Sequence, residues 1–448
     1  MNKDIFKAYD IRGIYQTELS AEDVKKIAMA YAAWLKPKRV ALGRDVRLSG
    51  PELWQAACDG LTEMGIDVLD IGIVSTDMLY FAVANYNLDG GITISASHNA
   101  GEYNGMKMIR EAARSLSIDT GIADIRELAF ENSFQTAELR GTVSKLDFMG
   151  DYISKITSFA DKEDIKPLKI LANPNFGASG VAVDKVADYY GLDLTRLNFE
   201  QNGSFPKGKP DPSQESNRLE TIAKVKEGNY DFAVIWDADA DRCVFIDEKG
   251  NYVLPYYISG LLTDYFFTKE PGAKMVVDVC LYWLPQELAR ANGGEIIVSK
   301  TGHSFIKKVM RDNDAIFGAE ASAHYYFRDY WYADNGMIPF VIMLQMISKT
   351  GKTLSELVSK YQSMIYALPI TNFIVSSVSE SVSVVKKKYS DAKTSEIDGF
   401  TAEYSDWRFN VRGSNTEPLL RLSLEAKTKE LAKQKLAELT EVINGEKV

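Results

Sequence analysis

Three aspartates alternate along the segment WDADADRC, a spacing that suits metal chemistry. Asp237, Asp239 and Asp241 directly follow the apolar run DFAVI, which predicts a buried strand. Alternate side chains of an extended backbone lie on one side, so the three carboxylates are expected to converge. A hard divalent cation relieves the repulsion between them, and few ligands with room for phosphate favour magnesium over calcium. The segment therefore predicts a magnesium site.

An EF-hand is the competing interpretation of this segment, because Asp237, Asp239, Asp241 and Glu248 have its ligand spacing. Its sixth position requires glycine for a sharp turn, but Arg242 stands there. The apolar run VFID inside the loop predicts a strand instead. We therefore reject the EF-hand.

The segment TISASHNAGEYNGMKMIR places Ser97, His98 and Asn99 at the end of another predicted strand. A serine hydroxyl must be activated to act as a nucleophile. The polar, glycine-containing loop and the nearby Lys107 could supply phosphate contacts and positive charge. The alternative is a turn that uses its polar side chains for backbone hydrogen bonds, and the segment alone leaves both open.

Two consecutive segments, TGHSFIKK and GAEASAHYYF, place polar side chains after predicted strands, where open α/β sheets form their ligand crevice. The candidates are His303, Lys307, Glu320, Ser322 and His324. The chain has only three histidines, and all lie in predicted strand-end loops. For each histidine alone, a structural role remains an alternative.

The segment FNVRGSNTEPLLRLSLEA combines arginines, hydroxyls and a glycine near the C-terminus. Its candidates for a phosphate cradle are Arg412, Ser414, Asn415, Thr416 and Arg421. A hairpin turn with exposed arginines is the alternative.

The elements that position these segments alternate between apolar strands and amphipathic helices, which is the βαβ pattern of mostly parallel sheets. The pattern occurs three times, and the final segment predicts an antiparallel sheet with helices packed on it. We expect an α/β fold of three similar domains with mixed, mostly parallel sheets and a C-terminal α+β domain with an antiparallel sheet. The expected limits are 1–146 with the serine loop, 147–250 with the aspartate loop, 251–366 with the glutamate loop, and 367–448 with the arginine loop.

The composition of the 448 residues is that of an ordinary folded protein, and the length exceeds one hydrophobic core. A net charge of -10 disfavours nucleic acid and anionic membranes as partners, so an anionic substrate requires a local positive cluster. Cys58, Cys243 and Cys280 are three in number and widely spaced, which argues against a disulfide framework and favours a reducing cytoplasm. The N-terminus lacks a signal-peptide core, and no apolar run is long enough for a membrane span.

Taken together and in this order, the segments resemble the α-D-phosphohexomutase superfamily, most closely its bacterial phosphomannomutase and phosphoglucomutase branch. The resemblance covers nearly the whole chain. The motifs that carry it are YDIRG at 9–13, SASHN at 95–99, DADADR at 237–242, GAEASAH at 318–324 and RGSNTEP at 412–418.

The resemblance implies a role for each candidate residue. Ser97 would be the phosphoserine, and its phosphate would join Asp237, Asp239 and Asp241 around Mg²⁺, with Arg242 assisting. Glu320 and Ser322 would hold sugar hydroxyls. The phosphate that does not react would bind to Arg412, Ser414, Asn415, Thr416 and Arg421. The resemblance completes the site with Tyr9, Arg12, His98, Lys107, His303 and His324.

The resemblance also implies a mechanism. Phosphorylated Ser97 would give its phosphoryl group to a hexose 1- or 6-phosphate, and the hexose 1,6-bisphosphate intermediate would turn around before returning the other phosphate. Lys107 and His324 are the main candidates for general base and acid, with His303 as a further candidate. A hinged C-terminal domain would release and recapture the intermediate.

The chain departs from the superfamily pattern at several positions. Ala238 and Ala240 replace the usual glycines of the metal loop, and Ala100 replaces a proline. The run VDVCLYWL lacks the basic residue that family members often carry, which leaves a substrate contact there in doubt.

The loop EASAH resembles those of mannose-type enzymes, so the predicted function is a phosphomannomutase. Phosphoglucomutase activity is the alternative, and dual specificity is compatible with the small energies that separate the two sugars. A non-catalytic sugar-phosphate-binding protein and a metal-dependent phosphatase are alternatives from other classes, and the presence of every catalytic position argues against them. We expect a monomer or a weak homo-oligomer.

Overall fold

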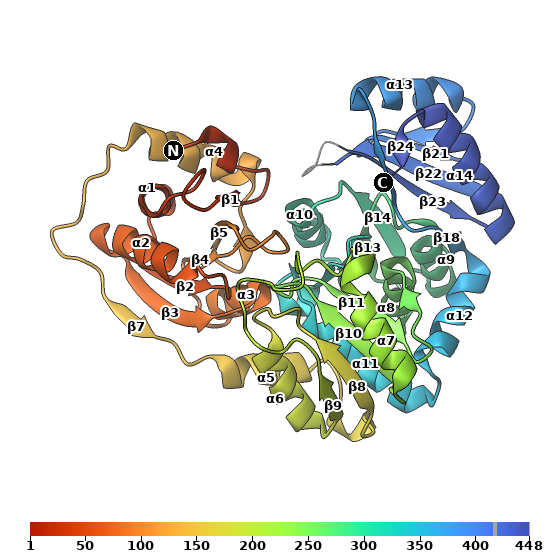
Figure 1. The fold of residues 1–448 in the computed structure, drawn as a ribbon, viewed down its shortest axis with the longest axis horizontal. Coiled ribbons are helices and arrows are strands. Elements are labelled where there is room, and N and C mark those ends of the chain that lie inside the picture. The colour runs from red at the N-terminus through yellow and green to blue at the C-terminus, as the bar shows by residue number, and fades with distance from the viewer. Residues whose placement is uncertain (415–418, 448) are drawn as a thin grey trace. The chain divides into compact units, whose positions relative to one another are not determined.

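The computed structural model describes residues 1–414 and 419–447 and divides into two compact units. The first unit contains Met1–Tyr252 and Asp329–Leu354, and the second contains Val253–Arg328 and Ser355–Val448. The described residues form four sheets, each with helices beside it (Figure 1). Three sheets are mixed or mostly parallel and the last is antiparallel, which confirms the predicted fold class.

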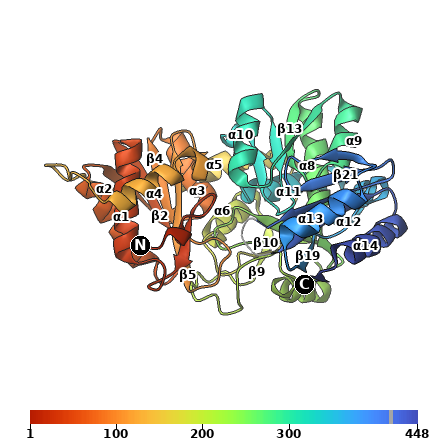
Figure 2. The ribbon, with the colours of Figure 1, turned by 90° about the horizontal axis from the view of Figure 1, so that it is seen from above.

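The first sheet has a parallel centre and an antiparallel edge. Its strands follow the order β1 (Ile11–Ile14), β5 (Tyr103–Arg110), β4 (Gly90–Ile94), β2 (Arg39–Arg44), β3 (Asp67–Ile73) and β7 (Val143–Lys145), with β6 (Arg114–Ser115) paired to β5. Strands β4, β2, β3 and β7 pair in parallel, and β5 pairs antiparallel with both β4 and β1. The helices are α1 (Ala21–Leu35), α2 (Gly50–Glu63), α3 (Thr76–Asn85) and α4 (Ile122–Glu131), and α1 packs on α2 and α4 (Figure 2).

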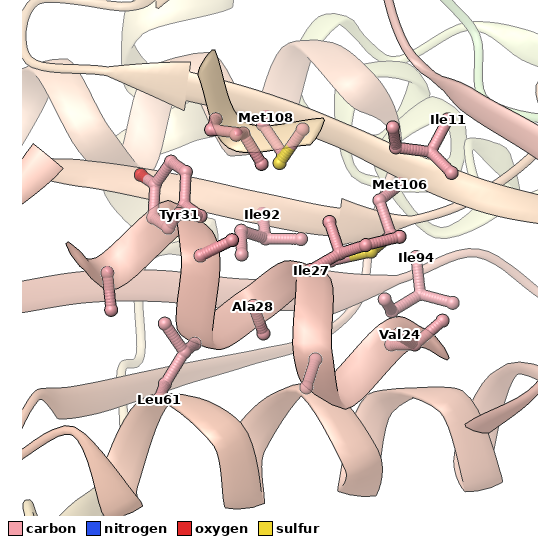
Figure 3. Packing of buried hydrophobic residues seen from close by; sticks show 14 of the residues in the cluster. Ile11, Val24, Ile27, Ala28, Tyr31, Leu61, Ile92, Ile94, Met106 and Met108 are labelled. Carbon is pink, nitrogen blue, oxygen red and sulfur yellow. The ribbon is translucent and has the colours of Figure 1, made fainter. Parts of the chain in front are cut away.

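Helix α1 covers this sheet with one apolar face. Val24, Ile27, Ala28 and Tyr31 are spaced at three or four residues, and each is 0% exposed. Figure 3 shows these side chains beside Ile92 and Ile94 of β4. The packing fixes β4 and β5, which lead to Ser97 and contain Lys107 respectively.

The second sheet also belongs to the first unit. Its strands follow the order β11 (Cys243–Asp247), β10 (Phe232–Trp236), β8 (Lys169–Asn173) and β9 (Asp193–Arg196). Strand β8 pairs in parallel with β9 and β10, whereas β11 returns antiparallel to β10. Its helices are α5 (Met149–Thr157), α6 (Gly180–Tyr190), α7 (Leu219–Glu227) and, from the returning segment, α11 (Met337–Thr350) after β17 (Ala333–Asp334). Strand β11 contains the apolar run that argued against an EF-hand.

The second unit contains the other two sheets. One has the order β14 (Glu295–Ser299), β13 (Lys274–Asp278), β15 (Phe317–Ala319) and β16 (Tyr325–Phe327), with α8 (Pro255–Lys269), α9 (Trp283–Asn292) and α10 (His303–Asn313). The antiparallel sheet has the order β20 (Lys393–Ser395), β21 (Phe400–Glu403), β22 (Trp407–Gly413), β23 (Leu420–Ala426), β19 (Thr371–Ile374) and β24 (Glu446–Lys447), with β18 (Tyr366–Ala367) on β23. Its neighbouring helices are α12 (Leu354–Met364), α13 (Val378–Lys388) and α14 (Lys429–Ile443).

None of the helices in the described part of the chain has the length and apolar character of a membrane span. Cys58, Cys243 and Cys280 are all free, as their number and spacing predicted, and all three are buried.

Asp77, at the start of α3, joins segments that are distant in the sequence. Its buried carboxylate accepts hydrogen bonds from Ser75 Oγ, from Tyr152 Oη at 2.5 Å and from Asn335 Nδ2 at 2.7 Å. Burial, together with the nearby charge of Asp334, raises the pKa of Asp77 to about 7, although the hydrogen bonds from Ser75 and Tyr152 oppose this shift. The first unit therefore contains a carboxyl group that is costly to ionise.

The variant Asp77→Asn tests this cost through the pH dependence of stability. A raised pKa in the folded state means that wild-type stability is fully present below the usual pKa of 3.8 and is lost as the pH rises from there through about 7. Asparagine does not ionise, so the variant does not lose stability in this way. The difference in unfolding free energy between the variant and the wild type is therefore expected to shift in favour of the variant by up to about 4 kcal/mol between about pH 4 and pH 8. Urea unfolding across this range measures the difference. An equal pH dependence in Asp77→Asn and wild type would contradict the interpretation, and Asp161→Asn, at an exposed position, is the control.

Candidate active site

Ser97 lies just beyond the end of β4 in a constrained loop. Its φ is 50°, in the left-handed region that residues with a side chain rarely adopt, and its side chain is buried. Its amide donates to Ser95 Oγ at 3.0 Å. Its Oγ lies 3.4 Å from Asp237 Oδ2 and 3.3 Å from His98 Nδ1. The serine predicted as nucleophile therefore contacts the predicted metal loop.

The aspartate loop connects β10 to β11 in a tight turn. Carboxylate oxygens of Asp237, Asp239 and Asp241 all lie within 4.8 Å of one another, and the three residues are buried. The main chain of the loop is held from outside, because Thr76 N donates to Asp239 O at 2.8 Å and Ala178 N donates to Ala238 O at 2.9 Å. The aspartates converge as predicted, but through a turn with Ala240 in the left-handed region and not through an extended backbone.

Two basic side chains balance these carboxylates. Lys107 Nζ lies 2.6 Å from both Asp239 Oδ2 and Asp241 Oδ2. Arg242 Nε lies 3.4 Å from Asp237 Oδ2. Burial by itself disfavours the lysine cation, but the two aspartates outweigh it and the pKa of Lys107 is raised well above its usual range.

The carboxylates retain capacity for a cation. Burial, and then the charges of Asp241 and Asp239, raise the pKa of Asp237 well above its usual range. Asp239 Oδ1 is buried and has no hydrogen-bond partner among residues 1–414 and 419–447. An unsatisfied buried oxygen is costly, and an all-oxygen donor set suits a hard cation such as Mg²⁺. The residues present therefore fit a magnesium ion.

Two of the remaining predicted residues of the first unit, Arg12 and His98, lie at the serine loop. Arg12 Nη1 donates to Asn99 Oδ1 at 2.7 Å, and Arg12 Nε pairs with Asp10 Oδ2 at 2.7 Å. His98 Nδ1 is hydrogen-bonded to Arg242 Nη2. Loss of solvation and then the charge of Arg242 hold the pKa of His98 well below its usual range, so the neutral ring can accept from the arginine. Tyr9 is half-buried and lies two residues before β1.

Thr76 is a member of this site that the sequence did not reveal. Its Oγ1 donates to Asp239 Oδ2 at 2.5 Å and accepts from Lys107 Nζ at 3.0 Å. The residue is buried at the first position of α3, far from the aspartates in sequence. No local pattern marks it, because its role depends on the contact between two sheets.

In the second unit, Glu320, Ser322 and His324 form one turn between β15 and β16. Glu320 N donates to His324 O at 3.0 Å, and Ser322 Oγ lies 2.7 Å from His324 Nδ1. Glu320 Oε1 accepts from Gly302 N at 2.6 Å, which joins this turn to the start of α10. There Lys307 Nζ lies 3.4 Å from His303 Nδ1. The two segments predicted to lie together therefore do so.

The arginine loop lies on β22 and β23. Arg412 and Arg421 are directly opposite in the strand register, so their side chains share one face of the sheet. Burial opposes the charge of Arg412, but Cys280, Asp398 and Asp278 outweigh it and raise its pKa. Ser414 N donates to Leu419 O at 2.8 Å. Asn415 and Thr416 lie outside the described residues.

A buried ion pair joins the antiparallel sheet to the segment VDVCLYWL. Glu425 pairs with Arg408 at 2.5 Å and accepts from Tyr282 N at 3.1 Å and Trp283 N at 3.0 Å, at the start of α9. Arg408 Nη2 donates to Val279 O at 2.8 Å. Where the sequence left a substrate contact in doubt, the structure shows a docking contact for the C-terminal sheet.

The variant Glu425→Gln tests this docking contact. It leaves Arg408 buried without its counter-charge, so we expect the second unit to lose about 3–5 kcal/mol of stability and the amides of Tyr282 and Trp283 to exchange faster. Hydrogen exchange with mass spectrometry measures both effects. Glu403→Gln, which removes the charge that pairs with exposed Lys393 at 3.0 Å but keeps an amide oxygen to accept from Trp283 Nε1, is the matched control. Equal effects of the two variants would contradict the role of Glu425.

The two alanines of the aspartate loop allow a second test. Ala240 has a φ of 52°, whereas Ala238 does not have a positive φ, and both are 0% exposed. Glycine at either position removes a buried methyl group and raises the conformational entropy of the unfolded chain, and both effects lower stability. Only Ala240→Gly also relieves the strain of a left-handed backbone, which is about 1–2 kcal/mol. We expect Ala240→Gly to be more stable than Ala238→Gly by about this amount in urea unfolding. Equal stability of the two variants would show that position 240 is not strained.

Comparison with known proteins yields matches along the whole chain. Family models described as phosphoglucomutase/phosphomannomutase alpha/beta/alpha domains I, II and III and C-terminal domain match residues 3–136, 150–250, 255–364 and 371–442 respectively. A phosphomannomutase of Vibrio cholerae is 40% identical over 98% of each chain. A phosphomannomutase of Escherichia coli is 39% identical over 94% of this chain and 95% of its own.

Solved structures show the same architecture. The crystal structure of a phosphoglucomutase/phosphomannomutase family protein from Burkholderia thailandensis has a TM-score of 0.88 at 28% identity and covers 99% of this chain and 98% of its own. Parafusin, a phosphoglucomutase from Paramecium, has a TM-score of 0.77 at 16% identity over 95% of this chain and 91% of its own, which shows a shared fold.

Proposed function

Since the chain belongs to the phosphoglucomutase/phosphomannomutase family, we propose that it is a phosphomannomutase that interconverts mannose 1-phosphate and mannose 6-phosphate through a phosphorylated Ser97. The observation that carries the proposal is the position of Ser97 Oγ, 3.4 Å from Asp237 in a buried group of three carboxylates. The names of the relatives from Vibrio cholerae and Escherichia coli support the mannose substrate.

In the proposed reaction, the phosphoryl group on Ser97 passes to the free hydroxyl of the bound hexose phosphate. The bond between phosphorus and Ser97 Oγ breaks, a bond to the sugar oxygen forms, the sugar hydroxyl loses its proton, and Oγ receives one. Lys107 and His324 are the proposed acid and base, with His303 as a further candidate. The hexose 1,6-bisphosphate then returns its other phosphate to Ser97, so the net change is the position of one phosphoryl group.

Asp237, Asp239, Asp241 and a phosphate oxygen on Ser97 would hold Mg²⁺, which would withdraw charge from the phosphoryl group. The buried, unpartnered Asp239 Oδ1 supports this assignment. Arg242, and Lys107 in its protonated form, add positive charge beside the carboxylates, and such pre-oriented charge is the main way in which proteins accelerate phosphoryl transfer.

Substrate binding is proposed for both units. We assign Tyr9 to substrate binding with Arg12 and His98, of which the last two lie at the serine loop, and Glu320 and Ser322 would accept and donate hydrogen bonds with sugar hydroxyls. Arg412, Ser414 and Arg421, with Asn415 and Thr416, would bind the phosphate that does not react. Two arginines on one face of a sheet supply the local positive charge that an acidic chain needs for an anionic substrate.

The finer parts of the proposal rest on the sequence. The loop EASAH favours mannose, and a dual-specificity or glucose-preferring enzyme is the second candidate because one hydroxyl orientation changes discrimination little. The net charge of -10 supports the proposal that neither nucleic acid nor membranes are partners. A cytoplasmic location and a monomer or weak homo-oligomer complete it.

The variant Ser97→Ala tests the covalent route. Conversion of mannose 1-phosphate, with Mg²⁺ and a trace of mannose 1,6-bisphosphate, is expected to fall by at least about a thousandfold because the nucleophile is lost. Phosphorus NMR follows the 6-phosphate product, and circular dichroism verifies the fold of the variant. Retained turnover in folded Ser97→Ala would contradict the route. Parallel assays of the wild type with glucose 1-phosphate decide between a mannose-specific and a dual-specificity enzyme.

A further inference from the structure

Arg47, in the loop between β2 and α2, binds the main chain of the loop that contains Ser97. Its side chain is 0% exposed. Its Nη2 donates to Ser97 O at 2.7 Å and to Asn99 O at 2.7 Å. Its Nη1 donates to Ala100 O at 2.6 Å and to Tyr103 O at 2.9 Å. One guanidinium group therefore binds four main-chain carbonyls of the serine loop.

Asp45 fixes the orientation of this guanidinium group. Its Oδ2 accepts from Arg47 Nε at 3.1 Å and from Ser95 Oγ at 2.7 Å, and its Oδ1 accepts from Arg47 N at 2.9 Å. Ser95 Oγ in turn accepts from the amide of Ser97 at 3.0 Å. Both the amide and the carbonyl of Ser97 are thus held by groups that depend on the Asp45–Arg47 pair.

This arrangement explains how Ser97 keeps an unfavourable backbone conformation. A φ of 50° is costly for serine and persists only when surrounding contacts determine it. Four carbonyl oxygens that converge also repel one another unless a cation lies between them. Arginine presents five donors in a rigid plane, whereas lysine presents three donors at a single point. Only arginine can meet all four carbonyls and Asp45 at once.

We propose that Arg47, oriented by Asp45, is a positioning residue for phosphoryl transfer. It holds the loop 97–103 so that Ser97 Oγ faces Asp237 in every catalytic cycle. Arg47 does not itself contact substrate. This inference rests on the proposed role of Ser97 as the phosphorylated residue.

The first test compares Arg47→Lys with wild type. We expect kcat for mannose 1-phosphate to fall by about tenfold to a hundredfold, because a small displacement of a reacting group has such an effect, while KM changes less than about twofold. Leu61→Ala, in the core of the same domain, is the control for lost stability and is expected to keep kcat. An unchanged kcat in Arg47→Lys, or an equal fall in Leu61→Ala, would overturn the inference.

Chemical rescue by guanidinium tests the positioning role of Arg47 through kcat. In Arg47→Ala, millimolar guanidinium chloride is expected to restore part of kcat, whereas sodium chloride at equal ionic strength is not. Absence of rescue in folded Arg47→Ala would overturn the inference. If this variant does not fold, Asp45→Asn takes its place, and it is expected to lower kcat without changing KM; an unchanged kcat there would overturn the inference as well.

Ser97→Ala separates this inference from the function on which it rests. An inactive Ser97→Ala with a fully active Arg47→Lys contradicts the role of Arg47 alone. An active Ser97→Ala contradicts both.

Discussion

The site depends on one electrostatic constraint: three carboxylates of a single turn are buried within 4.8 Å of one another. Such a group is unstable by itself, since burial and mutual repulsion both oppose ionisation. Lys107 and Arg242 offset part of the charge, and a divalent cation would offset the rest. The first unit is arranged around this need, because Lys107 comes from the first sheet and the aspartates come from the second. The ion pairs of Lys107 with the aspartate loop thereby join the two domains of the first unit next to the serine loop.

The same constraint accounts for the rigidity of the surrounding main chain. Ser97 and Ala240 both have φ values near 50°, and both lie in loops whose peptide groups are held by residues from other elements. Thr76 binds the aspartate loop through its backbone amide and its hydroxyl, and Arg47 binds main-chain carbonyls of the serine loop. Loops of this kind store strain that the folded scaffold sustains. The structure thus maintains a fixed geometry for a reaction in which positioning matters more than bond chemistry.

The sequence predicted the parts of this structure that depend on local pattern. Alternation located the aspartates on one side of a turn, and hydrophobic periodicity predicted the strands before Ser97, Asp237 and Glu320. Thr76 and the Glu425–Arg408 pair could not be predicted, because their partners are more than a hundred residues away or on neighbouring strands whose register the sequence does not reveal. Arg47 was missed for the same reason, since its function is to bind peptide carbonyls, which carry no sequence signal.

The most direct test of the central claim is to locate the phosphate on the protein. After incubation with Mg²⁺ and mannose 1,6-bisphosphate, peptide mapping by mass spectrometry is expected to find phosphate on Ser97, and excess mannose 6-phosphate is expected to remove it. Phosphate on another residue, or on none while the enzyme turns over, would contradict the account of Ser97 and the three aspartates as one phosphoryl-transfer site.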